Sequence, residues 1–237
     1  METASYATLS RQSGLMNEIR VVANNIANAS TTGYRQEGLV FSEYIQEARH
    51  QPSLSMARAE VRNTSLEQGV LTQTNAKFDL ALEGEGFFML DTESGDRLTR
   101  AGSFTPDAAG NLVSMSGHRV MDSNGAAIFV PPDAQTIHIA SDGTISADGR
   151  LVGQVGVFQP NNPRGMIREG GVMFRADDGV EATAEAKVMQ GFLEGSNVNA
   201  IEQVSRLVEI QRAYELGQSF LKTEDERIRN AVKNLMR

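Results

Sequence analysis

Apolar residues recur at alternating spacings of three and four near both ends of the chain. The N-terminal set is Leu9, Gln12, Met16, Ile19, Ala23 and Ile26. The C-terminal set is Leu207, Ile210, Tyr214, Gly217, Leu221, Glu224, Ile228, Ala231 and Leu235, with Ile201, Val204 and Val208 in a neighbouring stripe. Such spacing places the side chains on one stripe of an α-helix. It predicts helices within 4–28 and 197–236, and neither range contains a proline.

The middle of the chain alternates turn signals with short β-prone runs. Asp-Gly or Asn-Gly pairs occur at 124–125, 142–143, 148–149 and 178–179, and Ser-Gly pairs at 94–95 and 116–117. The runs between them are 87–90, 119–121, 127–130, 136–140 and 151–158. Glycine pairs of this kind close tight hairpins, so the pattern predicts a mainly antiparallel β domain.

The predicted fold class is therefore α+β. The expected parts are an N-terminal helix in 1–30, a connecting segment in 31–79, a central β domain in 80–185, and a return segment with the C-terminal helix in 186–237. A short helix is expected near Glu37–Arg49 within the connecting segment.

The two terminal helices need partners because a lone amphipathic helix buries little apolar surface. They can pair with each other as a coiled-coil-like unit, or with neighbouring copies. A plain alternative is an intramolecular hairpin that caps the β domain. A C-terminal helix of about 60 Å is, however, much longer than a domain of ~100 residues needs as a lid, which favours assembly.

Composition narrows the function classes. The net charge is −8; residues 1–30 sum to 0 and residues 197–237 to +1, so the middle carries −9. With no basic patch, binding to nucleic acid or to an anionic membrane is not expected. The chain has no cysteine, which excludes disulfides and thiolate metal sites. No stretch of eighteen apolar residues and no basic-then-apolar Sec signal is visible in the sequence.

Candidate chemistry is sparse. His50, His118 and His138 lie in separate segments without a second ligand at metal-binding spacing. The stretches that begin at Asp107 and Asp142 resemble calcium loops but lack the alternating oxygen ligands and the closing glutamate. No GxSxG sequence occurs. We therefore expect no cofactor, no metal, no small-molecule substrate and no enzymatic activity. A hydrolase on a β scaffold is the remaining enzymatic alternative.

Three blocks of sequence resemble the flagellar rod and hook proteins. They are residues 24–35, residues 69–117 and residues 190–215, in that family's order along the chain. The matching positions are Asn24, Asn25, Ile26, Asn28, Thr32, Gly33, Tyr34, Gly84, Gly86, Phe87, Phe88, Gly195, Ser196, Asn197 and Val198. Each block is moderately specific, and together they span nearly the whole chain.

The resemblance implies a structural subunit of the flagellar basal-body rod. In that family the terminal helices form an inner coiled-coil-like tube that transmits torque, and the β domain lies outside. The implied partners are copies of the chain, neighbouring proximal and distal rod subunits, and the export apparatus. The implied location is the rod where it crosses the periplasm, after export without a cleaved signal peptide. Short length without a longer insertion before the β domain favours a proximal rod member.

The interface residues of such a subunit are expected on the helical stripes. They are Leu9, Met16, Ile19, Ile26, Ile201, Val204, Leu207, Val208, Ile210, Tyr214, Leu221, Ile228 and Leu235. Knobs-into-holes packing of these side chains between subunits would resist twisting. The alternative from a different class is a secreted binding module or adhesin, which would hold a ligand with its β domain and oligomerise through its helices.

Overall fold

The computed structural model describes the backbone of residues 2–46 and 54–235, and the side chains of residues 8–39 and 63–234. The chain divides into two compact units, which are described separately. The helical unit comprises Met1–Ala27, Glu37–Asn63 and Asn199–Arg237, and the β unit comprises Asn28–Gln36 and Thr64–Val198. Within the described residues, no helix has both the length and the apolar character that a membrane crossing requires.

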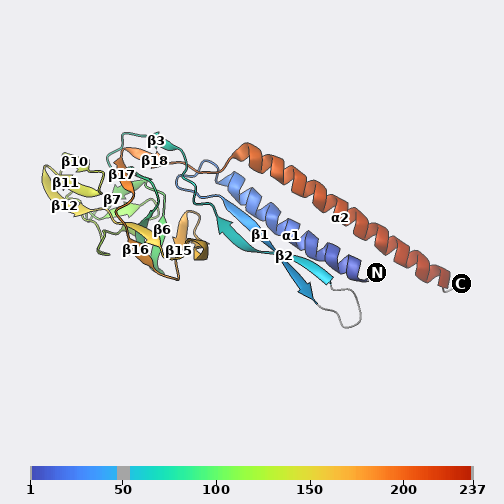
Figure 1. The fold of residues 1–237 in the computed structure, drawn as a ribbon. Helices are drawn as coiled ribbons and strands as arrows, with labels where there is room; N and C mark the ends of the chain where they lie inside the picture. The colour runs from blue at the N-terminus through green and yellow to red at the C-terminus, as the bar shows by residue number, and fades with distance from the viewer. Residues whose placement is uncertain (1, 47–53, 236–237) are drawn as a thin grey trace. The chain divides into compact units, whose positions relative to one another are not determined.

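Two long helices dominate the helical unit. Helix α1 spans Glu2–Ala27 and helix α2 spans Ala200–Leu235, so they measure roughly 39 Å and 54 Å at 1.5 Å per residue. They run antiparallel and side by side (Figure 1), and the predicted pairing of the two ends is confirmed. The Asn199 side chain caps α2 by accepting hydrogen bonds from the backbone N–H groups of Ile201 and Glu202, at 3.1 and 3.4 Å.

A β-hairpin completes the helical unit. Strands β1, Glu37–Gln46, and β2, Leu54–Thr64, form a two-stranded sheet, and β1 contacts α1. The helix predicted near Glu37–Arg49 is therefore wrong over Glu37–Gln46, and 47–49 lie outside the described residues. Pairing with the next strand and packing against α1 decide the conformation here, because contacts beyond the segment itself override weak local preference.

The β unit is built from short, mainly antiparallel strands, as predicted. They are β3 Leu71–Gln73, β4 Leu80–Glu83, β5 Phe87–Thr92, β6 Gly95–Thr99, β7 Phe104–Pro106, β8 Leu112–Ser114, β9 Arg119–Val120, β10 Ile137–Ile139, β11 Thr144–Ala147, β12 Arg150–Gln154, β13 Val157–Pro160, β14 Ile167–Glu169, β15 Met173–Arg175, β16 Val180–Ala182, β17 Lys187–Gln190 and β18 Phe192–Glu194, with a single 3-10 turn at Pro163–Gly165.

The largest sheet of the β unit has nine strands. Its main path is β14-β15-β6-β5-β9-β8-β7, and β13 joins β5 to β16. A three-stranded sheet, β10-β11-β12, and the pairs β17–β4 and β18–β3 complete the unit. The strands of the β unit pair antiparallel throughout. The return segment 190–194 thus pairs with residues that precede the main sheet.

The turns follow the glycine pattern of the sequence. The glycines at 95, 117, 125, 143, 149 and 179 all have φ between +78° and +99°. At Gly143 a Cβ atom would lie 2.8 Å from the Val155 carbonyl oxygen, so both the conformation and the space require glycine.

Two of the predicted strand runs differ from the structure. The run 127–130 forms only isolated bridges, Asn111 with Phe129 and Met121 with Ala127. The run 151–158 is divided into β12 and β13. Between them a Cβ atom on Gly156 would lie 2.6 Å from the Asp122 backbone, a close approach that interrupts regular strand geometry.

The core of the β unit lies on both faces of β5. Phe88 and Leu90 point into the larger cluster, whereas Phe87 and Met89 point into a second one. Alternation along a strand sends successive side chains to opposite faces, so an uninterrupted apolar run fits a strand that is covered on both sides. The Phe88 ring meets Phe104 edge-on, with 5.2 Å between the ring centroids.

Candidate assembly surfaces

The contact between α1 and α2 is fixed by polar groups. The buried Gln12 side chain donates to the Tyr214 carbonyl oxygen at 2.9 Å, and the Asn25 side chain donates to Gln203 at 3.1 Å. Glu18 pairs with Arg206 at 2.6 Å. These bonds join residues about 180 to 200 positions apart, so they fix the register of the helix pair.

The predicted interface residues of α1 are covered only in part within the chain. The exposed fractions of Leu9 and Met16 are 53% and 36%. Ile19 and Ile26 are half-buried. The buried apolar residues of α1 are instead Val21 and Val22. The stripe therefore remains available for contacts outside the chain.

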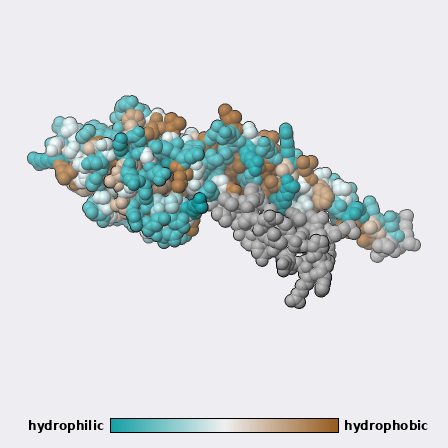
Figure 2. All heavy atoms as spheres, in the orientation of Figure 1, coloured by the Kyte–Doolittle hydropathy of each residue, from teal (hydrophilic) through white to brown (hydrophobic). Residues whose placement is uncertain are grey.

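The predicted interface residues of α2 divide into two faces. Ile210 is buried, and Leu207, Tyr214 and Leu221 are half-buried on the face that α1 covers. Three others, Ile201, Val204 and Val208, are exposed. Leu235 closes the helix, but its side chain lies outside the described part of the chain. Figure 2 shows apolar residues recurring along α2 among hydrophilic ones.

Helix α2 continues beyond the end of its partner. Because Gln12 lies opposite Tyr214 in an antiparallel pair, the start of α1 reaches roughly the level of residue 224. The apolar stripe that α1 covers continues past that point. Ile228 and Val232 lie on this continuation with exposed fractions of 52% and 48%. We call these two side chains the C-terminal ridge.

A groove of about 320 Å³ lies between the two helices. Its apolar walls include Leu15 of α1 and Leu216 and Phe220 of α2, and Arg11 stands at its side. Gly217 adds no side chain to it; a Cβ there would lie 2.5 Å from the amide nitrogen of Gln12. We call this hollow the helix groove.

The β unit contains a buried ion cluster of Arg35, Arg100 and Glu194. Glu194 accepts from Arg35 Nη2 at 2.9 Å and from Arg100 Nη1 at 3.1 Å, and all three side chains are at most 3% exposed. Burial lowers the pKa of Arg100 to about 10, and the neighbouring Glu194 charge opposes this shift. The pKa of Arg35 is lowered for the same reason and with the same opposing charge. With a pKa of about 10, the Arg100 guanidinium remains charged at neutral pH.

The ion cluster joins the segments that enter and leave the β unit. The Gly69 N–H also donates to Glu194 Oε1, at 3.0 Å, and the Gly33 N–H donates to the Glu194 carbonyl oxygen at 2.8 Å. Arg100 donates to the carbonyl oxygen of Gly84 at 2.5 Å. Four separate stretches of the sequence therefore meet at a single carboxylate and its backbone.

The remaining family-motif residues lie around these contacts. The Asn197 side chain accepts from the Gln36 N–H at 2.6 Å, and the Asn197 N–H donates to the Tyr34 carbonyl oxygen. Tyr34 is fully buried. In the helical unit, Asn25 is buried and Asn24 is exposed. The half-buried motif residues include Asn28, Thr32, Gly195, Ser196 and Val198, whereas Gly84 and Gly86 lie in the turn before the buried Phe87 and Phe88.

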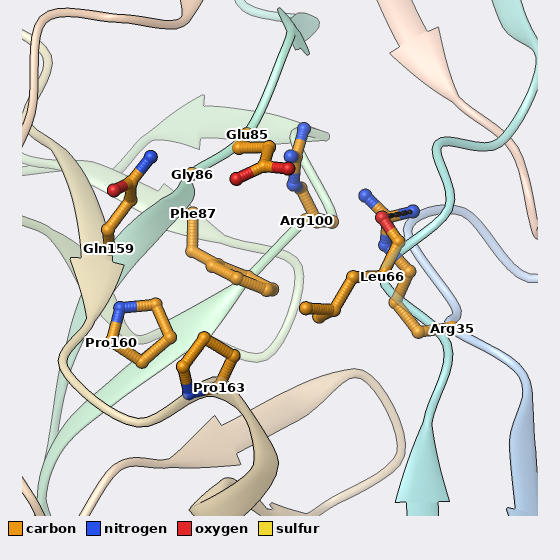
Figure 3. Close-up of a pocket in the computed structure, with 9 residues that line it drawn as sticks. All are labelled: Arg35, Leu66, Glu85, Gly86, Phe87, Arg100, Gln159, Pro160 and Pro163. Carbon is orange, nitrogen blue, oxygen red and sulfur yellow. Dashed lines mark hydrogen bonds between the residues drawn. The ribbon is translucent and has the colours of Figure 1, made fainter.

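A small pocket of about 60 Å³ lies beside this cluster (Figure 3). Phe87, Leu66 and Pro163 form its apolar side, and Arg35 donates to the Leu66 carbonyl oxygen at 3.2 Å. The volume is far below the roughly 300–1,000 Å³ of small-molecule sites. Across residues that the structure describes, no three His, Cys, Asp or Glu side chains gather as a metal site would require.

Comparison with known proteins gives the family. Three family models match: "Flagella basal body rod protein" over residues 6–35, "Flagellar hook protein FlgE/F/G D1 domain" over 81–147, and "Flagellar basal body rod FlgEFG protein C-terminal" over 189–234. These matches contain the blocks 24–35 and 190–215 completely and the block 69–117 from residue 81 onward.

Full-length relatives agree with the family models. The basal-body rod protein FlgF of Caulobacter vibrioides is 35% identical, over 99% of this chain and 98% of its own length. FlgF of Mesorhizobium japonicum is 32% identical with the same coverage, and FlgG of Bacillus subtilis is 29% identical over 98% of both chains. The comparisons give no support to the adhesin alternative. Matched from end to end by these relatives, the chain belongs to the flagellar basal-body rod protein family.

Proposed function

We propose that this chain builds the rod by packing the exposed apolar stripes of α1 and α2 against neighbouring rod subunits. The observation that carries the proposal is the exposure of Leu9, Met16, Ile201, Val204 and Val208 in a member of a structural family. Apolar surface that a chain cannot bury by itself is typical of an assembly contact. The assembled helices would form the tube that transmits torque.

The proximal position in the rod is supported by the relatives. The FlgF proteins of Caulobacter vibrioides, Mesorhizobium japonicum and Rhizobium meliloti share 32–35% identity with the chain. FlgF of Escherichia coli shares 29%, and four FlgG proteins share 29–31%. We place the subunit with the FlgF type because the three highest of these identities belong to FlgF proteins. Its partners would be copies of itself and adjoining rod subunits, after passage through the flagellar export apparatus.

Nothing in the proposed role requires chemistry. In the β unit, His118 is half-buried and His138 is exposed, and His50 lies outside the described residues. Replacing all three together should leave motility unchanged. The role instead depends on helix surfaces and on a β unit that holds its own shape.

Deletion tests the proposal directly. Cells that lack the chain should fail to swim, and electron micrographs of their basal bodies should show an incomplete rod. Restoring the chain should restore both. Swimming cells with complete rods after the deletion would contradict a structural role in the rod.

A further inference from the structure

The helix groove offers an apolar surface that lies open in the helical unit. Leu216 and Phe220, on its α2 side, are 73% and 43% exposed. The polar bond from Gln12 to Tyr214 holds the floor of the groove in place, and Gly217 keeps it free of a side chain. A groove between two paired helices is a suitable site for a third helix, whose side chains enter as a ridge.

The C-terminal ridge is an apolar helix surface of matching kind. Ile228 and Val232 lie one turn apart on α2, on the continuation of the stripe that α1 covers nearer the start of the helix. That stripe therefore already packs against a helix along part of its length. Beyond about residue 224, α1 is too short to cover it.

The ridge cannot reach the groove of its own chain. The ridge and the α2 wall of the groove belong to the same continuous helix, and their centres are separated by about 13 residues, or roughly 20 Å along the axis. A straight helix does not fold back on itself, so the two surfaces can meet only between different molecules. A second copy of this chain supplies both.

Charge does not oppose such a contact. Arg11 beside the groove is exposed. Near the ridge, Arg227 pairs with Glu224 at 2.7 Å, and Arg229 pairs with Asp225 at 2.8 Å. The carboxylates on the same helix turn therefore offset the positive charges that would otherwise face Arg11.

We infer that the C-terminal ridge of one copy docks in the helix groove of the next. The inference rests on the proposed rod function and names the surfaces that meet. The contact joins two different patches, so every copy still offers one free ridge and one free groove. A contact of this kind that does not close on itself produces an open helical chain.

Cysteine crosslinking tests the contact in assembled rods, because the natural chain has no cysteine. Cells would carry the full chain with both Leu216→Cys and Val232→Cys, and would be grown with a reductant. Basal bodies would then be purified and oxidised. Docking predicts a ladder of covalent dimers, trimers and longer multimers on a non-reducing gel, whereas each single-cysteine chain should remain monomeric.

A matched control places the second cysteine at nearly the same position along α2 but on the opposite face of the helix. The pair Leu216→Cys and Asn230→Cys should give no ladder. Covalent dimers from either single-cysteine chain, without a ladder from the pair, would overturn the inference because they indicate a symmetric contact. A motile strain whose purified rods yield no crosslink would overturn it too.

The rod function can fail separately from the docking contact. Absence of the chain from purified basal bodies would contradict the rod function. Presence of the chain without the ladder would contradict only the docking. The first cysteine pair could prevent swimming even in reductant. In that case the pair Phe220→Cys and Ile228→Cys probes the same groove and ridge. Only monomers on the gel from this second pair would equally overturn the inference.

Discussion

The β unit buries most of its large apolar side chains, whereas the helical unit leaves most of its own in contact with solvent. Among the described side chains of the helical unit, only Val21, Val22 and Ile210 are buried large apolar residues. Its exposed ones are Leu9, Met16, Ile201, Val204, Val208, Leu216, Phe220, Ile228 and Val232. One unit thus has a core sufficient for its own folding, and the other carries surface that needs a partner.

The two units also differ in the polar groups that they bury. In the β unit two guanidinium groups share one carboxylate, Glu194, with little access to water. In the helical unit the buried polar groups include the amides of Gln12, Asn25 and Gln203 and the carboxylate of Glu37. A buried charge that loses its partner is costly. Loss of Glu194 would remove the carboxylate from two buried guanidinium groups at once.

The largest expected effect is in the ion cluster. Glu194→Ala leaves Arg35 and Arg100 buried without their carboxylate, and the loss of one partner of a buried pair costs about 3–5 kcal/mol. The free energy of unfolding of the β unit should fall by that amount. Denaturant unfolding followed by circular dichroism would measure it, with the buried Tyr34 as a local reporter.

The matched control is an exposed ion pair on the same unit. Asp91 meets Arg119 at 2.8 Å, and the Arg119 side chain is 55% exposed. Asp91→Ala should cost at most about 1 kcal/mol, because water solvates the remaining charge. Equal losses for the two substitutions would show that burial of the ion cluster adds nothing to stability.

A smaller effect per contact is expected on the C-terminal ridge, with a large consequence for assembly. Ile228→Asp places a charge where an apolar contact between subunits is expected, at a cost of about 2 kcal/mol or more. A rod repeats the contact, so swimming should stop. The thermal midpoint of the β unit should stay unchanged, since Ile228 is 52% exposed in the isolated chain.

Glu226→Ala, on the opposite side of α2, serves as the control and should be nearly silent. Normal swimming with ordinary amounts of the Ile228→Asp chain would rule out this side chain as an assembly contact. Unfolding of the β unit by the same substitution would do so as well, because the helix would then belong to one intramolecular core.

Local patterns were sufficient for much of the fold. The Xaa-Gly pairs predicted hairpin turns because tight turns need positive φ, and glycine supplies it at Gly125, Gly149 and Gly179. The alternating spacing of three and four between apolar positions predicted both helices, because this pattern also depends only on residues close together in the sequence. Strand β1 was missed because its partner is a later strand, and the sequence of Glu37–Gln46 alone does not specify that pairing.

The details of the surfaces were harder to predict. Periodicity identifies an apolar stripe but not which neighbour covers it; on α1 the intrachain contact uses Val21 and Val22, beside the predicted stripe. The ion cluster was missed because Arg100 and Glu194 are 94 positions apart. The available signal was weak: a glutamate directly follows two apolar residues at the end of the short strand Phe192–Glu194.

Limited proteolysis should separate the two units under native conditions. The helical unit has few buried apolar contacts, so it should open locally at a lower free energy than the β unit. Trypsin should therefore cut the purified dilute chain first within the terminal helices, for example after Arg212 or Lys222, which are exposed. Mass spectrometry should find a resistant fragment near residues 70–190. Survival of the intact chain would contradict the difference in stability between the units.

The smallest expected effect concerns acid sensitivity of the turns in the β unit. The side chain of Asp142 accepts from the Thr144 N–H at 2.9 Å, and this bond lowers the pKa of Asp142 in the folded chain. The unfolded chain then binds the proton at the higher pH, near the ordinary value of about 3.9. The stabilisation is complete above that pH and is lost as the pH falls through the lower folded pKa.

Asp142→Asn keeps a hydrogen-bond acceptor but removes the charge. The variant should be slightly less stable than the natural chain at pH 7, and the two should converge as the pH falls through the lowered folded pKa of Asp142, because both side chains are then neutral. Asp133→Asn, at an exposed loop position, should leave the fall of the thermal midpoint at low pH unchanged. Thermal midpoints measured between pH 2 and pH 7 would test both. A difference between Asp142→Asn and the natural chain that stays constant across this range would show that the Asp142 charge contributes nothing to the turn.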